Sequence, residues 1–215
     1  VKNIILADEN RKYVIPSAPG KRNSKDTKVT DLLYLCHMHV ETGISSADVF
    51  KHVEDRYKQI VEELGLNFDI EKYLNIVKED IEAGSSKDYA ASRGEYLNGL
   101  ILANYLGYEF VDAKDVIVFD EEGSLNTEAT NKALQERLSK TEKAVIPGFY
   151  GANEDGEIVT FSRGGSDVTG ALVAASIGAK LYENWTDVSG FLMADPRIVD
   201  NPKSIDYITY KELRE

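Results

Sequence analysis

The 215-residue sequence has little cysteine, a shortage of basic charge and no long apolar run, and each of these excludes a class of protein. Cys36 is the only cysteine, so neither an intrachain disulfide nor a cysteine-based metal cluster can form. The 25 basic residues against 37 acidic ones give a formal charge of −12, which argues against nucleic acid as a partner. No apolar run reaches membrane-spanning length, and no signal peptide is visible. We therefore expect a soluble, cytoplasmic protein with no membrane or nucleic-acid partner.

Two sets of phosphate-transfer motifs are also missing. The sequence contains neither a Gly-x-x-x-x-Gly-Lys-Ser/Thr loop nor the protein-kinase motif set, which argues against phosphoryl transfer by either of those folds. The histidines predict no metal site, because His37 and His39 lie two residues apart and leave a helix on different faces. With His52, they are interpreted as surface or packing residues.

Strands alternate with helices along the sequence, and this order predicts an α/β fold with a mostly parallel sheet covered on both faces. We expect helices near both chain ends and over residues 30–40, 45–64, 73–84, 85–107, 126–138 and 168–177. We expect strands at residues 13–15, 108–111, 116–119, 144–147, 158–161, 179–183 and 204–207, with a hairpin turn at 153–156. The first helix has no cap and the last has barely begun, so the chain is expected to be cut at both ends.

The loop between the first strand and the next helix allows two interpretations. Lys21–Lys28 is either a solvated loop or a mobile basic lid over anionic substrates. Ser45 and Asp48 resemble a capping box, and the apolar stripes that follow are assigned to packing rather than to chemistry.

Inside the helix expected at 85–107, Gly94 costs roughly 1 kcal/mol relative to alanine, which indicates a packing or ligand reason for it. Taken by its residue type alone, Glu95 is an exposed helix charge.

The stretch from Thr160 to Arg197 organises the rest of the chain. A glycine turn with one cation and one carboxylate, residues 161–167, precedes a helix whose apolar residues recur at helical spacing. Two glycines before a helix let backbone N–H groups approach an anion, and the helix dipole favours negative charge there. Arg163 adds a planar fork that suits a carboxylate or a phosphate. This unit therefore predicts a site for an anionic ligand.

Three motifs within this stretch, in order, resemble those of aspartate kinases in the amino-acid kinase superfamily: Ser162–Asp167, Trp185–Val188 and Asp195–Arg197. The alternative interpretation is a glycine turn that caps a core helix, followed by an ordinary loop. The resemblance covers nearly the whole chain. It implies one catalytic domain over residues 1–215, with the three-layer αβα fold of amino-acid (carbamate) kinases, truncated at both ends and without the ACT regulatory domains.

The resemblance also implies a role for each matching residue. Asp167 would be catalytic, orienting the reaction centre. Arg163 would bind a carboxylate of L-aspartate, and Glu95 would face its ammonium group. The remaining substrate contacts would be Ser17, Thr30, Gly164, Gly165 and Ser166. The nucleotide site would be lined by Thr186, Asp187, Asp195 and Arg197. Magnesium would be carried by the ATP, with no metal held by the protein.

The sequence departs from the family pattern in several places. The amino-terminal Lys-Phe-Gly-Gly segment and the downstream Gly-Ala-Lys segment are absent, and Leu192 stands where many relatives have tyrosine. Because the missing lysine bridges the transferring phosphate in the family, the 215 residues alone are expected to be inactive. Homo-oligomers would form through the missing regulatory region.

The expected activity is ATP-dependent phosphorylation of the side-chain carboxylate of L-aspartate, the first step of lysine, threonine and methionine biosynthesis. Such a transfer needs no general base, because the acceptor oxygen is already ionised. Alignment and charge neutralisation remain as the tasks of the protein. Two alternatives stay open: another amino-acid kinase, of the glutamate or acetylglutamate type, and a non-catalytic nucleotide-binding domain of this fold.

Overall fold

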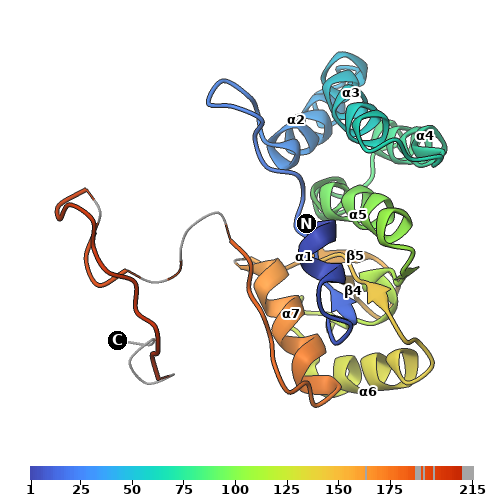
Figure 1. Cartoon of the computed structure of the whole chain (residues 1–215). Coiled ribbons are helices and arrows are strands. Elements are labelled where there is room, and N and C mark those ends of the chain that lie inside the picture. Colours follow the sequence, from blue (N-terminus) through green and yellow to red (C-terminus); the bar gives the residue numbers. More distant parts are fainter. Residues whose placement is uncertain (163, 187–189, 191, 196, 210–215) are drawn as a thin grey trace. The chain divides into compact units, whose positions relative to one another are not determined.

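The computed structural model describes residues 1–162, 164–186, 190, 192–195 and 197–209. The chain forms two compact units, Val1–Tyr182 and Glu183–Glu215 (Figure 1). All the helices and strands named below belong to the first unit. None of its described helices combines the length and the apolar character that crossing a membrane requires.

A small parallel sheet lies at the centre of the first unit. Its strands are β1 (Tyr13–Val14), β2 (Glu109–Phe110) and β3 (Ala144–Val145), in the order β1-β3-β2. Hydrogen bonds extend the β1–β3 pairing beyond these bounds, because the N–H of Gly148 donates to the carbonyl of Pro16 at 3.1 Å. The carboxyl ends of these two strands therefore lie side by side.

Helices cover both faces of this sheet, as the alternation of side chains along β3 requires. Val145 points to one face, where it packs with Ile5 of α1 (Lys2–Leu6) and Leu106 of α5 (Lys87–Leu106). Ala144 and its neighbour Ile146 point to the other face, against α6 (Thr127–Leu138) and α7 (Gly165–Ser176) (Figure 1). The predicted three-layer α/β arrangement with a parallel sheet is confirmed.

An antiparallel hairpin adjoins the sheet. It consists of β4 (Tyr150–Ala152) and β5 (Ile158–Thr160), joined by the predicted turn at residues 153–156. The strand predicted at 116–119 is wrong: the 3-10 helix η1 (Ala113–Asp115) leads into it, and only isolated bridges form at Val118 and Phe119. The reason is local, because the Asp112 carboxylate caps the N–H of Lys114 and curls the backbone before a ladder can begin.

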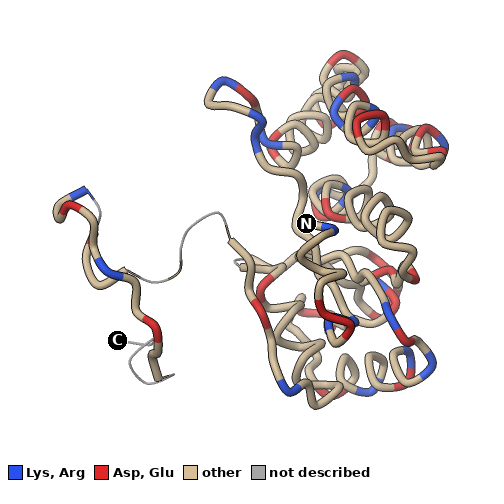
Figure 2. The backbone as a smooth tube through the Cα atoms, viewed as in Figure 1, with Lys and Arg blue, Asp and Glu red and all other residues tan. Residues whose placement is uncertain are grey.

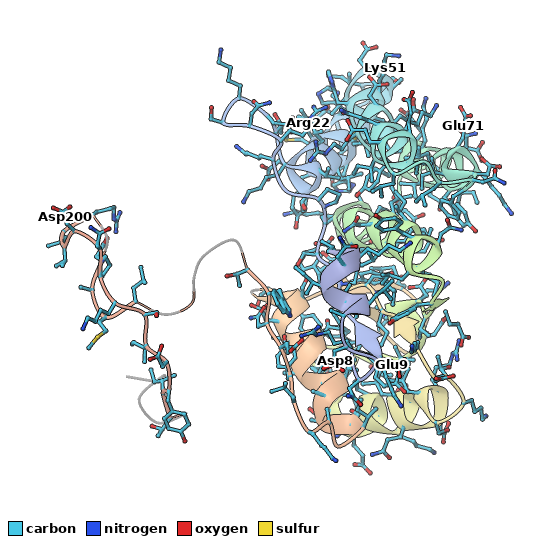
Figure 3. The ribbon with its side chains drawn as sticks, viewed as in Figure 1. Asp8, Glu9, Arg22, Lys51, Glu71 and Asp200 are labelled. Carbon is cyan, nitrogen blue, oxygen red and sulfur yellow. The ribbon has the colours of Figure 1, made fainter. Side chains whose placement is uncertain are left out.

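Three further helices pack with α5 around a core of their own. They are α2 (Val29–Glu41), α3 (Ala47–Glu63) and α4 (Ile70–Glu82). Their acidic and basic residues are spread over the backbone of this part of the molecule (Figure 2). Exposed charges such as Lys51 on α3 and Glu71 on α4 extend outward (Figure 3). The assignment to packing holds for stripe residues such as Tyr57 and Val77, which are buried, whereas Leu64 and Ile76 of the predicted stripes are exposed.

The capping box predicted at the start of α3 is wrong. The cap position is Ser46, one residue later than expected, and its side chain makes no capping hydrogen bond within the helix. Instead, a carboxylate oxygen of Glu82, at the end of α4, accepts from the Ser46 N–H at 2.8 Å and from its hydroxyl at 2.7 Å. A carboxylate from a neighbouring helix thus takes over the capping role, which single-sequence spacing cannot predict.

The Lys21–Lys28 loop is attached to α3 at its base. Asp26 accepts from the Arg22 side chain at 3.0 Å, and Arg22 also donates to Gln59 of α3 at 2.9 Å. Arg56, on the same helix, donates to the Gly20 carbonyl at 2.6 Å. The three lysines of the loop are exposed. The anchored base fits either interpretation of the loop, so the lid stays a prediction.

The structure corrects two further expectations near the end of the first unit. Helix α7 begins at Gly165 rather than Val168, because Gly164 adopts the left-handed conformation (φ 58°) and starts the helix at once. Residues 179–183 form no strand. They have no ladder partner among the described residues, and Leu181 and Tyr182 are exposed. In the second unit, the strand predicted at 204–207 reduces to one bridge between Ser204 and Leu192.

Candidate active site

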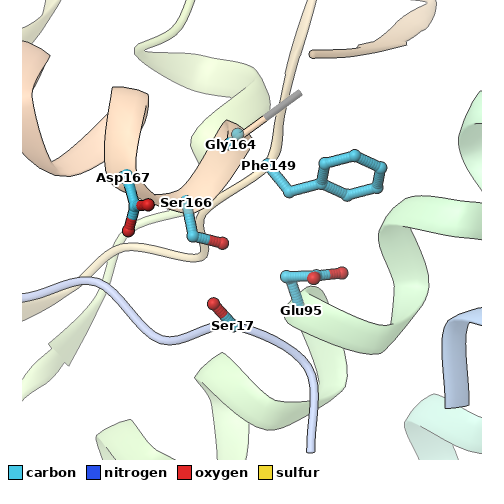
Figure 4. A pocket seen from close by; sticks show the side chains of 7 residues that line it. Ser17, Glu95, Phe149, Gly164, Ser166 and Asp167 are labelled. Atoms are coloured by element: carbon cyan, nitrogen blue, oxygen red, sulfur yellow. The ribbon is translucent and has the colours of Figure 1, made fainter. Parts of the chain in front are cut away.

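A pocket opens where the carboxyl ends of β1 and β3 meet the start of α7. Its volume is about 260 Å³, and its walls are formed by Ser17, Glu95, Phe149 and the segment Gly164–Asp167. Ser17 follows β1, Phe149 follows β3, Glu95 comes from α5, and the last segment begins α7 (Figure 4). A crevice at the carboxyl ends of parallel strands is the usual ligand site of open α/β sheets. The small volume suits a small ligand.

Close contact between two backbones forms one wall of this pocket. A Cβ atom added to Gly148 would lie 2.6 Å from the Cα of Ser166, and one added to Gly165 would lie 2.7 Å from the Cα of Phe149. Both positions therefore require glycine. Phe149 itself has φ 80°, a backbone conformation that costs an aromatic residue roughly 1–3 kcal/mol. Strain of this kind persists where the surrounding contacts determine the geometry, as they do beside this pocket.

The first turn of α7 faces the pocket with its backbone N–H groups. These groups have no intrahelical acceptors by position, and the dipole of the 12-residue helix places partial positive charge there. Ser166 contributes a hydroxyl at the same point, and Asp167 a carboxylate (Figure 4). The start of α7 is therefore suited to bind an anionic group of a ligand.

Glu95 is the most unusual residue of the pocket. Its side chain is only 6% exposed, although it carries a carboxyl group. One carboxylate oxygen, Oε1, accepts from the N–H of Ala18 at 3.1 Å, and the other, Oε2, is buried with no hydrogen-bond partner among the described residues. Burial raises the pKa of Glu95 to about 7, and the bond from Ala18 opposes that rise. A buried, unpartnered carboxylate oxygen is costly unless a ligand supplies a donor or a positive charge.

Helix α5 holds both Glu95 and the Ser17 segment in place. Close packing explains why a glycine stands at position 94 in the helix interior, because an added Cβ would lie 3.0 Å from the Cβ of Ala18. Asn98, one turn after Gly94, donates to the carbonyl of Ser17 at 2.6 Å. Behind the pocket, the buried hydroxyl of Tyr57 donates to the carbonyl of Gly94 at 2.6 Å. The packing reason predicted for Gly94 is confirmed.

The structure brings together five of the residues predicted for the substrate and the predicted catalytic residue Asp167. The five are Ser17, Glu95, Gly164, Gly165 and Ser166. Thr30 lies in the first turn of α2 and does not line this pocket. Arg163 and Asp187 lie outside the described residues. Phe149 was not predicted, although the segment Gly148–Gly151 that follows a buried strand is a signal for a turn at the site.

The predicted nucleotide residues Thr186, Asp195 and Arg197 belong to the second unit. Two of them form an ion pair in which the Arg197 side chain donates to both carboxylate oxygens of Asp195, at 3.0 Å and 2.6 Å. These hydrogen bonds lower the pKa of Asp195. The backbone N–H of Arg197 also donates to Asp195, at 2.8 Å, so the pair fixes the local turn.

Among the described residues, no group of three or more His, Cys, Asp and Glu side chains could hold a metal ion. The fold and the pocket together define an α/β protein with a small pocket at the sheet edge, between a helix N-terminus and a buried carboxylate. A cation on the ligand would face Glu95, and an anion would face α7.

Comparison with known proteins agrees with this description. The family model described as the amino acid kinase family matches residues 11–215. Aspartokinase 3 of Bacillus subtilis (strain 168) is 38% identical over 230 residues, which cover 100% of this chain and 50% of that protein. This chain belongs to the amino acid kinase family.

Solved structures extend the similarity to the fold. The crystal structure of Clostridium acetobutylicum aspartate kinase has a TM-score of 0.95 and 60% sequence identity, covering 99% of this chain and 49% of that one. E. coli aspartokinase III in complex with aspartate and ADP has a TM-score of 0.76 at 26% identity, covering 95% of this chain and 49% of that one. The chain thus spans about half the length of these relatives.

Proposed function

We propose that this protein transfers the γ-phosphoryl group of ATP to the side-chain carboxylate of L-aspartate, giving 4-phospho-L-aspartate and ADP. This would make it an aspartate kinase, acting in the biosynthesis of the lysine, threonine and methionine group of amino acids. The relatives that carry this name, and the complex of one of them with aspartate and ADP, support the proposal.

In the proposed reaction, a carboxylate oxygen of aspartate attacks the γ-phosphorus. The new O–P bond forms as the bond from the γ-phosphorus to the β,γ-bridging oxygen breaks, and ADP leaves. No proton is abstracted, so the protein has to align the reactants and stabilise charge. Within the pocket, Ser17, Ser166 and the N-terminal N–H groups of α7 would orient the substrate, and Asp167 would orient the reaction centre. The substrate contacts of Arg163 and Thr30 are still predictions from the resemblance.

The observation that carries the proposal is the buried oxygen Oε2 of Glu95, which has no hydrogen-bond partner among the described residues. An α-ammonium group would supply both the missing donor and the missing positive charge. A free amino acid satisfies this requirement. An N-acetylated one does not, because its amide N–H is neutral and carries a bulky group. The geometry therefore favours aspartate over acetylglutamate, and the small pocket favours aspartate over glutamate.

ATP would bind at the second unit through Thr186, Asp187, Asp195 and Arg197, and magnesium would arrive with it. The phosphates of ATP would be its main ligands. When bound, magnesium would neutralise charge on the phosphates. We further propose that the protein is a cytoplasmic homo-oligomer.

The test is an ADP-release assay with the natively expressed protein, run in parallel with trapping of the product by hydroxylamine, which converts acyl phosphates to hydroxamates. We expect hydroxamate only when ATP and aspartate are both present, and far less with glutamate or N-acetylglutamate. Faster turnover of N-acetylglutamate would overturn the assignment of Glu95 to the ammonium group. Nucleotide binding without any acceptor-dependent turnover would favour a non-catalytic domain.

A further inference from the structure

A buried arginine lies two residues before Glu95, outside the pocket lining. Arg93 is only 5% exposed, and its guanidinium makes no ion pair with a carboxylate among the described residues. Its hydrogen bonds go to the neighbouring hydroxyl of Ser92, from Nε at 3.1 Å and from one terminal nitrogen at 2.9 Å. Because a buried, unpaired charge is expensive, this position calls for a compensating interaction.

Three tyrosine rings provide that compensation. The guanidinium carbon of Arg93 lies 4.4 Å from the ring centre of Tyr89, 4.5 Å from that of Tyr96 and 5.2 Å from that of Tyr150. Tyr89 and Tyr96 share one face of α5 with Arg93, and Tyr150 comes from β4. Each ring attracts the cation through its electron-rich face. These four side chains are called the arginine cage below.

Two carboxylates strengthen the arginine cage from outside. The hydroxyl of Tyr150 donates to Asp112 at 2.7 Å, and the hydroxyl of Tyr89 donates to Asp80. Donation to a carboxylate makes a phenol ring richer in electrons, so both rings hold the cation more firmly. The arrangement links α4, α5, β4 and the start of η1 through one buried positive charge.

The cage also joins the two walls of the pocket. On one side, Arg93 is followed in α5 by Gly94 and Glu95. On the other, Tyr150 follows Phe149, the pocket residue with the strained backbone. A cation fixed between these elements sets their spacing, and it places a positive charge near the buried carboxylate.

We infer that Arg93 is a positioning residue for the amino-acid substrate, which braces the Glu95 turn of α5 against the Phe149 turn through the arginine cage. The effect of Arg93 on aspartate binding rests on the proposed function. The effect of Arg93 on Glu95 does not, because it is measured without substrate.

Several groups face Glu95 from the surrounding elements. They are Tyr34 of α2, Tyr57 of α3 and the N–H of Ala18, while Asp167 of α7 lines the same pocket. None of these carries positive charge. Burial raises the pKa of Glu95, whereas the Ala18 bond and the charge of Arg93 lower it. Loss of Arg93 should therefore move the titration of Glu95 to higher pH.

The test compares Arg93→Met, which removes the charge, with Arg93→Lys, which keeps it. The control is Arg137→Met, which removes a half-buried arginine paired with Glu109 on the far side of the sheet. The side-chain carboxyl of Glu95 is followed by ¹³C NMR in the ligand-free protein, and its signal is assigned by its disappearance in Glu95→Gln. Melting temperatures of all variants are recorded alongside.

We expect the Glu95 midpoint to rise by about half a pH unit or more in Arg93→Met, and to stay near the wild-type value in Arg93→Lys and Arg137→Met. The pH at which kcat/KM for aspartate falls on the acid side should move with it. A lower melting temperature with an unchanged Glu95 midpoint would overturn the inference, leaving Arg93 a packing residue. Absence of aspartate turnover in the wild-type protein would refute the proposed function alone, because the midpoint shift is measured without substrate.

Discussion

An ionised Glu95 makes the folded protein less stable, because its carboxylate is buried in the pocket wall. The carboxyl is buried, and one oxygen lacks a partner among the described residues. The cost is borne by the ligand-free fold whenever Glu95 is ionised. A substrate ammonium would remove it on binding, so part of the binding free energy arises from relief of that cost.

The first prediction concerns stability without ligand. The pKa of Glu95 is raised from 4.5 to about 7, so its favourable contribution to folding exists below pH 4.5 and is lost as the pH rises to 7. Glu95→Gln cannot ionise and escapes this loss. The variant should therefore melt higher than wild type at pH 8, with a difference of up to about 3 kcal/mol in the free energy of unfolding, and nearly equally at pH 5.

Glu82→Gln is the control for this prediction, since the sign there is opposite. Hydrogen bonds from Ser46 lower the pKa of Glu82, so its contribution is present above the unfolded value and is lost on acidification. Glu82→Gln should be less stable than wild type at pH 8, and this deficit should shrink toward pH 4. Thermal melts of both variants across this range provide the measurement. A Glu95→Gln variant that melts below wild type at pH 8 would contradict the account of the buried carboxyl.

The proposed role of Glu95 does not follow from pattern alone. By spacing it is an ordinary helix charge, and only the resemblance to aspartate kinases marked it as a substrate contact. Its burial arises from Ala18 and the Ser17 segment, which lie about 77 positions away in sequence. Long-range packing of this kind leaves no periodic signal in a single chain.

At the scale of elements, Gly148 and Gly165 allow the backbone at the start of α7 to contact the turn after β3. The second prediction is that Gly148→Ala weakens aspartate binding about tenfold or more, because the new Cβ would lie 2.6 Å from the backbone of Ser166 and displace the pocket wall. Isothermal titration with aspartate measures this loss.

The matched control is Asn126→Ala, which removes the side-chain cap of α6 at Ala129. It should cost about 1 kcal/mol of stability while aspartate affinity stays unchanged. If both variants lost affinity in proportion to stability, the contact at Gly148 would have only a general packing role.

Sequence patterns predicted the long amphipathic helices well and the short strands less well. The helices end close to where the apolar periodicity ends, since that periodicity is the physical cause of their burial. The strand predicted at 116–119 failed because Asp112 caps a tight turn just before it. The strand predicted at 179–183 does not form, because a strand requires a paired neighbour as well as apolar residues. The start of α7 was missed by three residues, because a left-handed glycine can open a helix without a polar cap.

At the scale of the whole molecule, the residues proposed for the two ligands belong to different units. The amino-acid pocket lies in the first unit, and Asp195 and Arg197 belong to the second. The third prediction is that Arg197→Ala weakens ADP binding about tenfold and leaves aspartate binding nearly unchanged, because Arg197 is assigned to the nucleotide alone. Titration of each ligand separately provides the measurement, with Arg137→Ala as a control on α6. Equal losses for aspartate and ADP would show that the two assignments cannot be separated.

The fold follows from the order of strands and helices. The resemblance predicted this fold and most of the residues that line the pocket. The relation of the Lys21–Lys28 loop to substrate is still a prediction, as are the contacts of Thr30 and Arg163.

The central claim is that the pocket recognises a free amino acid through the charge of Glu95. It is tested most directly by the ratio of kcat/KM for aspartate to that for succinate, which differs from aspartate only in lacking the amino group. The ratio is measured at pH 8 in the natively expressed wild-type protein and in Glu95→Gln, with a thermal melt to verify folding. We predict that the substitution lowers this ratio on the order of tenfold or more, because the group that recognises the ammonium no longer carries charge. An unchanged ratio in a folded variant would contradict the account and return Glu95 to the role of a buried structural residue.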